Sequence, residues 1–241
     1  MRSVSVMMTR AATAAVLMVG ALRLEAQVPT VQQVYDKYAT AVGGRDAWAK
    51  VSGRTEKGTT DVTFAGISGS YERHSALPNK MRMIIDLGVV KIDQGFDGEK
   101  GWADQGQGLQ RMPADQEQRL AEGGQLGDAF LDPSRLAKAA VEGKETFDGS
   151  EAYKLSVTTK GGQESVEYFD VATGLRLGSI VKSPTGEQKV TYRDYKDFEG
   201  KKIATKVIQT NAQGDIVINI QIVEFKVPDA SLFKAPARSP R

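Results

Sequence analysis

Few residues of this sequence are of a type that carries out covalent chemistry. The chain has no cysteine and a single histidine, His74, so it has no thiol nucleophile and no thiolate metal ligand. A serine triad would have to use His74, and the nearby stretch 66–69, Gly-Ile-Ser-Gly, lacks the spacing of a nucleophile elbow. We therefore expect His74 to be an ordinary surface histidine and the protein not to be an enzyme.

The motifs that bind nucleotides and metals are equally incomplete. The stretch 106–108, Gly-Gln-Gly, has no later glycine, and no Gly-Lys-Ser/Thr follows a glycine loop. Asp93 and the pair Asp97-Gly98 lack the spacing and the closing glutamate of a calcium loop, and the pair is typical of a hairpin turn. We expect no cofactor and no metal. A hydrolase with two close carboxylates remains the enzymatic alternative, because the many acidic residues include no pair that the sequence singles out.

The first 26 residues have the three zones of an export signal. Arg2 and Arg10 are basic, residues 11–22 are small or apolar, and Ala26 provides a small residue at the cleavage site. The apolar run is too short to span a bilayer, which takes about 20 residues. No cysteine follows it that could be lipidated. We expect a signal peptide over 1–26 and a single exported domain over 27–241.

The charge balance argues against a nucleic-acid partner. The formal net charge is +2, and residues 1–26 contain three arginines and one glutamate, so the positive excess belongs to the signal. Nucleic-acid binding requires concentrated positive charge, and no cluster of Lys and Arg interleaved with aromatic residues is present. The remaining length suits one β-rich domain with a sizeable core that forms without disulfides.

The elements that would position a site are one clear helix followed by many strands. Residues 30–42 place apolar side chains at helical spacing, with Thr30 as the N-cap and Gly43 after the end. From about residue 54 the apolar pattern has a period of two, as in 81–85 and 216–223. Asp-Gly and Gly-containing turns separate the runs. This rhythm predicts a meander of roughly ten antiparallel strands, forming a barrel or an open half-barrel.

One segment, residues 112–141, interrupts the strand pattern. Met112-Pro113 and Asp132-Pro133 are typical helix starts, and Leu136, Ala139 and Ala140 would form the apolar face of the second helix. We expect a helical insert here. It is either a connector packed on the end of the sheet or a lid over the concave face of the sheet.

Several short motifs, taken in order, resemble a known family. They are Tyr35-Asp36-Lys37-Tyr38 before Gly43-Gly44, Pro78-Asn79-Lys80, Gly95-Phe96-Asp97-Gly98 with Gly101-Trp102, Tyr168-Phe169-Asp170 before Thr173-Gly174-Leu175, Asp194-Tyr195 with Gly200, and Leu232-Phe233 before Pro236. From about residue 29 to 236 the chain resembles the periplasmic outer-membrane lipoprotein-sorting proteins of the LolA-like superfamily, as a divergent member. The resemblance implies a mainly β fold with flanking helices: a curved antiparallel sheet forming an unclosed half-barrel, with helices covering its open side.

The resemblance also implies a function, because members of that superfamily carry or sense acyl chains or lipoproteins. We expect a periplasmic monomer that binds lipid or lipoprotein acyl chains and contacts an envelope membrane protein. The alternative is a non-enzymatic envelope sensor or protein-interaction module. Methionine adapts to chains of variable shape, and the candidate lining of an apolar pocket is Met81, Met83, Ile85, Phe96, Trp102, Tyr168 and Leu175. An ordinary core would use the same residues.

Overall fold

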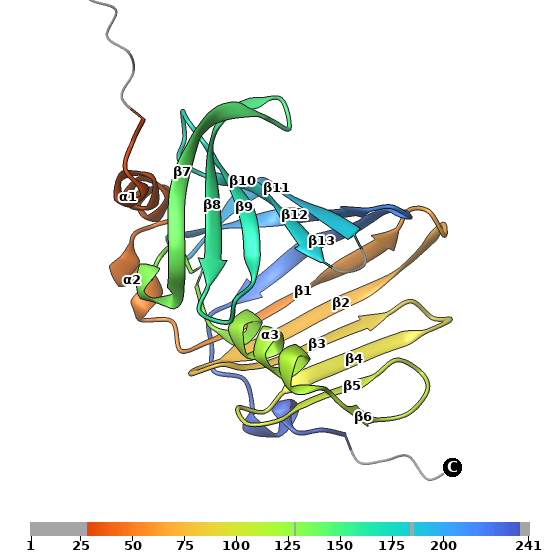
Figure 1. Ribbon diagram of the computed structural model, residues 1–241. Helices are drawn as coiled ribbons and strands as arrows, with labels where there is room; N and C mark the ends of the chain where they lie inside the picture. The colour runs from red at the N-terminus through yellow and green to blue at the C-terminus, as the bar shows by residue number, and fades with distance from the viewer. Residues whose placement is uncertain (1–27, 128, 184–185, 237–241) are drawn as a thin grey trace, which may run out of the picture.

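The computed structural model describes residues 28–127, 129–183 and 186–236 (Figure 1). The expected signal peptide therefore lies outside the described residues. The described chain is mostly strand, and its strands form one antiparallel sheet that does not close into a barrel. This confirms the fold class that the sequence predicts.

The sheet has thirteen strands in the order β6-β5-β4-β3-β2-β1-β13-β12-β11-β10-β9-β8-β7. Each pair of hydrogen-bonded strands except β1 and β13 is consecutive in sequence, so the sheet is a meander. Its first strand, β1, and its last, β13, pair in the middle of the sheet. The strands are β1 Gly53–Val62, β2 Ile67–Ala76, β3 Lys80–Asp86, β4 Lys91–Phe96, β5 Gly101–Asp104, β6 Gln110–Arg111, β7 Leu136–Phe147, β8 Ser150–Thr159, β9 Glu164–Asp170, β10 Arg176–Ser183, β11 Gly186–Phe198, β12 Lys201–Asn211 and β13 Gly214–Glu224.

The predicted hairpin turns form where their residue types allow the required backbone. Asp148 and Gly149 join β7 to β8 with φ angles of 51° and 84°, which is the positive-φ pair of a type I′ turn. Asp97 shapes the β4–β5 turn, because its Oδ1 accepts hydrogen bonds from the backbone N–H groups of Glu99 and Lys100, both at 2.8 Å. Asp97 thus serves the hairpin.

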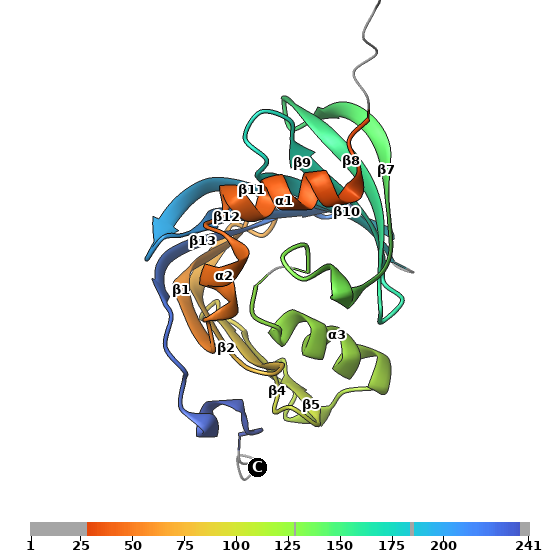
Figure 2. The ribbon, with the colours of Figure 1, turned by 90° about the vertical axis from the view of Figure 1, so that its left-hand side faces the viewer.

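Helices close two sides of the curved sheet (Figure 2). Helix α1, Val31–Ala41, begins with a capping box in which Thr30 Oγ1 accepts from Gln33 N at 3.2 Å, and Gln33 Oε1 accepts from Thr30 N at 2.8 Å. Together with the short α2, Arg45–Ala49, it lies across one end of the half-barrel. Helix α3, Ala114–Gly124, lies in the gap between the two arms of the sheet. Among the described helices, none is both long and apolar enough to cross a membrane.

The predicted helical insert over 112–141 is only partly helical. It contains α3 and a short 3-10 turn, η1 Pro133–Arg135, in which Asp132 accepts a hydrogen bond from Ser134 N at 3.2 Å. Residues 136–141 belong to the edge strand β7 instead of a second helix. Leu136 and Ala139 are spaced for a helix, but the pairing of β7 with β8 overrides that local pattern.

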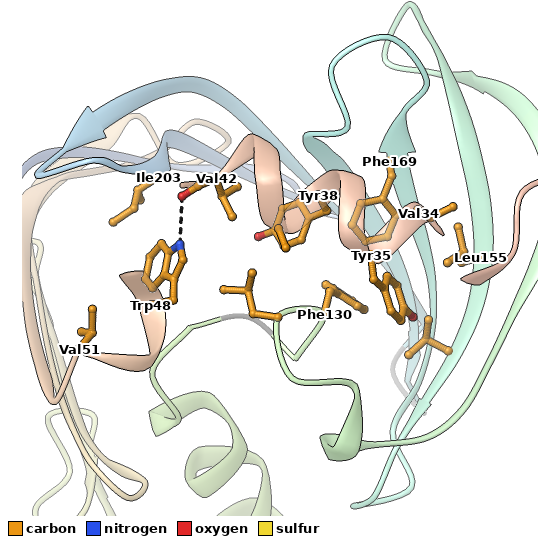
Figure 3. Packing of buried hydrophobic residues seen from close by; sticks show 13 residues of the cluster. Val34, Tyr35, Tyr38, Val42, Trp48, Val51, Phe130, Leu155, Phe169 and Ile203 are labelled. Carbon is orange, nitrogen blue, oxygen red and sulfur yellow. Dashed lines mark hydrogen bonds between the residues drawn. The ribbon is translucent and has the colours of Figure 1, made fainter. Parts of the chain in front are cut away.

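The main core lies beneath α1 and α2, at one end of the concave face (Figure 3). Phe169 is fully buried and its ring packs edge-on against Phe130 at 5.1 Å and Tyr38 at 5.4 Å between centroids. Tyr35 completes this group, 5.3 Å from Phe130. Trp48 donates a hydrogen bond from Nε1 to the carbonyl of Val42 at 3.0 Å. We call this group, with the aliphatic residues around it, the aromatic plug.

Candidate functional site

Next to the aromatic plug, the concave face forms a half-open cavity of about 800 Å³, and Tyr38, Trp48 and Phe130 of the plug are part of its lining. Strands from both arms of the sheet line it, and the segment 122–136, which includes the end of α3, borders it. We call the following aliphatic residues of its lining the aliphatic wall: Met83, Val157, Val181, Val190, Val207, Ile218 and Ile220. A volume of this size lies within the range of about 300–1,000 Å³ that is usual for small-molecule sites.

A first group of charged residues reaches the cavity from β1 and β2. Arg54 lies 3.1 Å from the carboxylate of Glu56, measured from Nε to Oε1. Tyr71 donates a long hydrogen bond from its hydroxyl to Glu56 Oε2, at 3.4 Å. Arg73 is paired directly across from Glu56 in the sheet register, so both side chains point to the concave face. Burial, and then the charge of Glu56, raise the pKa of Tyr71 to about 12, so this phenol stays neutral at physiological pH.

A second group lies on β9 and β10, in the opposite arm. Arg176 Nη2 lies 2.6 Å from Glu167 Oε2, and Arg176 Nε donates to the same oxygen at 2.8 Å. Ser165 Oγ donates to the other carboxylate oxygen of Glu167 at 2.7 Å. The Arg176 guanidinium also covers the ring of Phe130 at 5.0 Å, which places this ion pair where the aromatic plug meets the cavity.

Tyr192 on β11 lies between the two groups. Its ring centroid is 4.5 Å from Arg176 Cζ, and it lines the same cavity as Arg73. The two groups together contain three arginines and two glutamates, and therefore a net positive charge. The remaining charged residues of the lining are Glu122, Arg135, Lys160 and Lys202. Basic side chains thus outnumber acidic ones around this cavity.

Helix α3 borders the cavity on the open side of the half-barrel. Glu117 Oε1 accepts a hydrogen bond from the backbone N–H of Gly101 on β5 at 2.9 Å. At the other end of the helix, Thr159 Oγ1 on β8 donates to Glu122 Oε1 at 3.5 Å. The helix therefore bridges the two arms, and its bond to the far arm is the longer one.

A smaller groove of about 420 Å³ lies outside this cavity, along the start of α1. It is lined by the helix and by the ends of β8 and β9, with Lys37 and Asp170 among its residues. We take the larger cavity as the candidate site because it lies on the concave face and has aliphatic residues from several strands in its lining.

The structure separates the residues that the sequence singled out for an apolar pocket. Met81, Met83 and Ile85 share the concave face of β3, and Phe96, on β4, lies opposite Met81 in the sheet register. Of these four, Met83 lines the cavity, whereas Met81 and Phe96 are buried in the wall. Ile85 packs on the neighbouring cluster of Tyr71, Ile218 and Ile220. Contact of Met83 with a ligand stays a prediction.

The other three residues lie elsewhere. Trp102 pairs with Gly95 on the convex face, under the carboxyl-terminal segment, where its Nε1 donates to the carbonyl of Phe233 at 3.2 Å. Tyr168 also faces outward and stacks on Phe147, with centroids 4.2 Å apart. Leu175 packs at the edge of the aromatic plug. The convex face carries apolar clusters of its own, which is why alternation did not identify the inner face of these strands.

His74 is buried and is not the surface histidine that the sequence predicts. Its side chain lies on the convex face of β2 and the residue is 6% exposed. Its Nδ1 lies 3.0 Å from Thr55 Oγ1, and its Nε2 lies 3.1 Å from Glu72 Oε1. Burial lowers the pKa of His74, so the ring is neutral at neutral pH. Within the described part of the chain, no cluster of His, Cys, Asp or Glu is arranged to hold a metal ion.

The sequence analysis missed the charged residues of the cavity. Glu167 and Arg73 occur at alternating positions of strands, where charge normally indicates the solvent side. The sequence held one weak signal: Arg73 is two positions from the aromatic Tyr71, so the two share a face of the strand. In the structure, Tyr71 and Ser75 on this face are buried. A charge in register with buried residues is a sign of an internal polar site.

Three solved structures of bacterial proteins are similar to this chain. A LolA superfamily protein from Nitrosomonas europaea is 13% identical, with a TM-score of 0.60 over 86% of this chain and 98% of that one. A domain of an outer membrane lipoprotein-sorting protein from Vibrio parahaemolyticus is also 13% identical, with a TM-score of 0.57 over 83% of this chain and 95% of that one. A DUF1329 family protein from Desulfovibrio piger is 14% identical, with a TM-score of 0.58 over 85% and 97% of the two chains.

These likenesses define the class of protein at the level of fold. The chain has the LolA-like half-barrel, as the resemblance in its motifs implies. No family model matches the sequence, and no curated protein matches it. The chain is therefore a divergent example of this fold.

Proposed function

We propose that this protein binds a lipid, or the acyl chains of a lipidated protein, in the concave cavity, and carries it through the periplasm without catalysing a reaction. The observation that carries the proposal is the cavity of about 800 Å³ with an aliphatic wall inside the half-barrel. An ordinary core would fill such a space, because protein interiors are close-packed.

The energetics support an acyl ligand. An aliphatic chain gains about 0.8 kcal/mol for each methylene that leaves water. The aliphatic residues from Val181 to Ile220 offer apolar contact along four neighbouring strands, β10 to β13. Helix α3 bridges the open side, so a bound chain would be shielded from solvent on that side as well.

The periplasmic location and the absence of catalysis belong to the same proposal. The three-zone sequence pattern over 1–26, which predicts an export signal, supports the location, and the names of the similar structures fit it. The cavity lining has no histidine or cysteine, and each of its buried carboxylates, Glu56 and Glu167, contacts an arginine. A carboxylate with a raised pKa that could act as a general acid is the feature that would favour a hydrolase instead.

Native mass spectrometry with solvent extraction tests the proposal on protein purified from the periplasm of expressing cells. A bound species of one acyl-containing molecule per chain is the expected result, and its mass identifies the class of cargo. A clean apo mass, combined with no uptake of the apolar dye Nile red, would contradict the proposal. That outcome favours the envelope sensor or protein-interaction module.

A further inference from the structure

We infer that the ligand of this cavity is an anionic amphiphile, whose carboxylate or phosphate head binds between Arg73 and Arg176 and whose chain lies along the aliphatic wall. The inference rests on the proposed function and adds the chemical class of the ligand and its orientation. It starts from the placement of charge inside a half-barrel that could have been lined by apolar residues alone.

Buried charge is costly unless it is paired and hydrogen-bonded. The cavity nevertheless holds three guanidinium groups, from Arg54, Arg73 and Arg176, with the carboxylates of Glu56 and Glu167. Each carboxylate has an arginine at 3.1 Å or less. Glu56 lies opposite Arg73 in the sheet register as well as beside Arg54, so the two carboxylates face three guanidinium groups and the inner group has a net positive charge. A fold that only needed to enclose an acyl chain would have no use for this excess.

Both arms of the sheet direct positive charge into the same cavity. Arg73 lines it from β2 and Arg176 from β10, and Tyr192, whose ring lies against Arg176, lines it from β11, which comes between β2 and β10 in the strand order. Its phenol is a further donor toward a bound anion. An anion at this point would receive charge-assisted hydrogen bonds, the strong class, in a setting shielded from bulk water.

The same placement sets the direction of the chain. The charged residues adjoin the aromatic plug, since Arg176 covers Phe130. The aliphatic residues Val181, Val190 and Ile218 lie nearer the ends of their strands that point away from α1. A head group among the arginines therefore leaves the aliphatic wall to the chain, which would extend away from α1 toward the end of the half-barrel with the β1–β2 and β3–β4 turns (Figure 1).

Displacement of Nile red tests the inference, because this reporter is uncharged. The competitors share one eighteen-carbon chain and differ in the head: oleate, oleoyl lysophosphatidate, oleyl alcohol and oleylamine. We expect the anions to displace the dye at concentrations at least about tenfold lower than the alcohol or the amine, the factor that a single charge-assisted hydrogen bond provides. An advantage for oleate alone assigns a carboxylate head, and an advantage for the phosphate compound assigns a phosphate head.

Substitution of Arg73 adds a test within the chain. Arg73→Met leaves the Arg54–Glu56 and Arg176–Glu167 pairs in place, and we expect it to abolish most of the advantage of the anions while oleyl alcohol binds as before. Arg73→Lys keeps the charge and should retain the advantage. Lys206→Met is the matched control, because Lys206 lies on β12 beside Val207 and faces the convex side. It should behave as wild type.

The possible failures are distinguishable. Equal displacement by oleate and oleyl alcohol in the wild-type protein would overturn the inference and leave the proposed function intact. Failure of the protein to take up Nile red, or of every chain to displace it, would overturn the proposed function itself. The comparison of head groups on wild-type protein does not require any variant to fold.

Discussion

The two ends of the concave face differ in what fills them. Beneath α1 and α2, the rings of Tyr35, Tyr38, Phe130 and Phe169 pack against one another, and all four residues are buried. Further along the same strands, the side chains are aliphatic or charged, and about 800 Å³ stays open. One sheet thus provides a packed core at one end and a lined cavity at the other.

This difference indicates that one end of the concave face stabilises the fold and that the other binds a ligand. Aromatic burial and edge-to-face contacts favour folding at the plug. Buried arginines and an open volume favour neither folding nor close packing. We therefore interpret the plug as the part that holds the half-barrel together and the cavity as the part that is kept for a ligand.

Truncation of one residue at each end gives the largest contrast in stability. Phe169→Ala removes a fully buried ring, and we expect it to lower the free energy of unfolding by about 4 kcal/mol. Met83→Ala enlarges a space that is already open and should cost about 1 kcal/mol or less. Urea unfolding of both variants measures the difference, and similar losses would show that the cavity end is packed like a core.

Substitution within the second ion pair has an intermediate effect. Glu167→Gln leaves the Arg176 charge in the cavity wall without its carboxylate. We expect a loss of about 2 kcal/mol, below the ~3–5 kcal/mol of a dry buried pair, because the pair borders an open cavity. Replacing both residues by Met should restore most of the stability. A double variant less stable than Glu167→Gln would contradict the view that these charges serve the ligand.

A change of pH should affect the stability of the fold, through His74 on the convex face, and not ligand binding on the concave face. This effect is smaller than the two above. Burial lowers the pKa of His74 below its ordinary value of 6.5, so the unfolded chain takes up this proton first as the pH falls. Stability should therefore decrease below about pH 6.5, by less than about 1 kcal/mol, and His74→Gln should flatten the curve. Nile red binding should stay constant from pH 6 to 8, because the cavity lining lacks histidine. A parallel fall in binding would contradict this separation.

The sequence predicts the fold better than it predicts the site. The helix at 31–41 and the hairpin at Asp148-Gly149 follow from local rules of capping and turn conformation, and both are present. The strand at 136–141 depends on pairing with β8, which local spacing does not reveal. The sequence analysis also assigned the wrong face of β9 to the cavity, because Tyr168 is buried on the convex face whereas Glu167 is buried on the concave face. A site built on buried charge reverses the usual meaning of alternation.

Thiol labelling of two adjacent positions on β3 tests whether the acyl chain binds in the cavity, since the chain contains no other cysteine. Met83→Cys places a thiol in the cavity, and Ile84→Cys places one on the convex face. With oleate bound, we expect the rate of maleimide labelling to fall roughly tenfold at position 83 and to stay unchanged at position 84. Equal rates with and without oleate at position 83, under conditions where oleate displaces Nile red, would show that the acyl chain binds elsewhere.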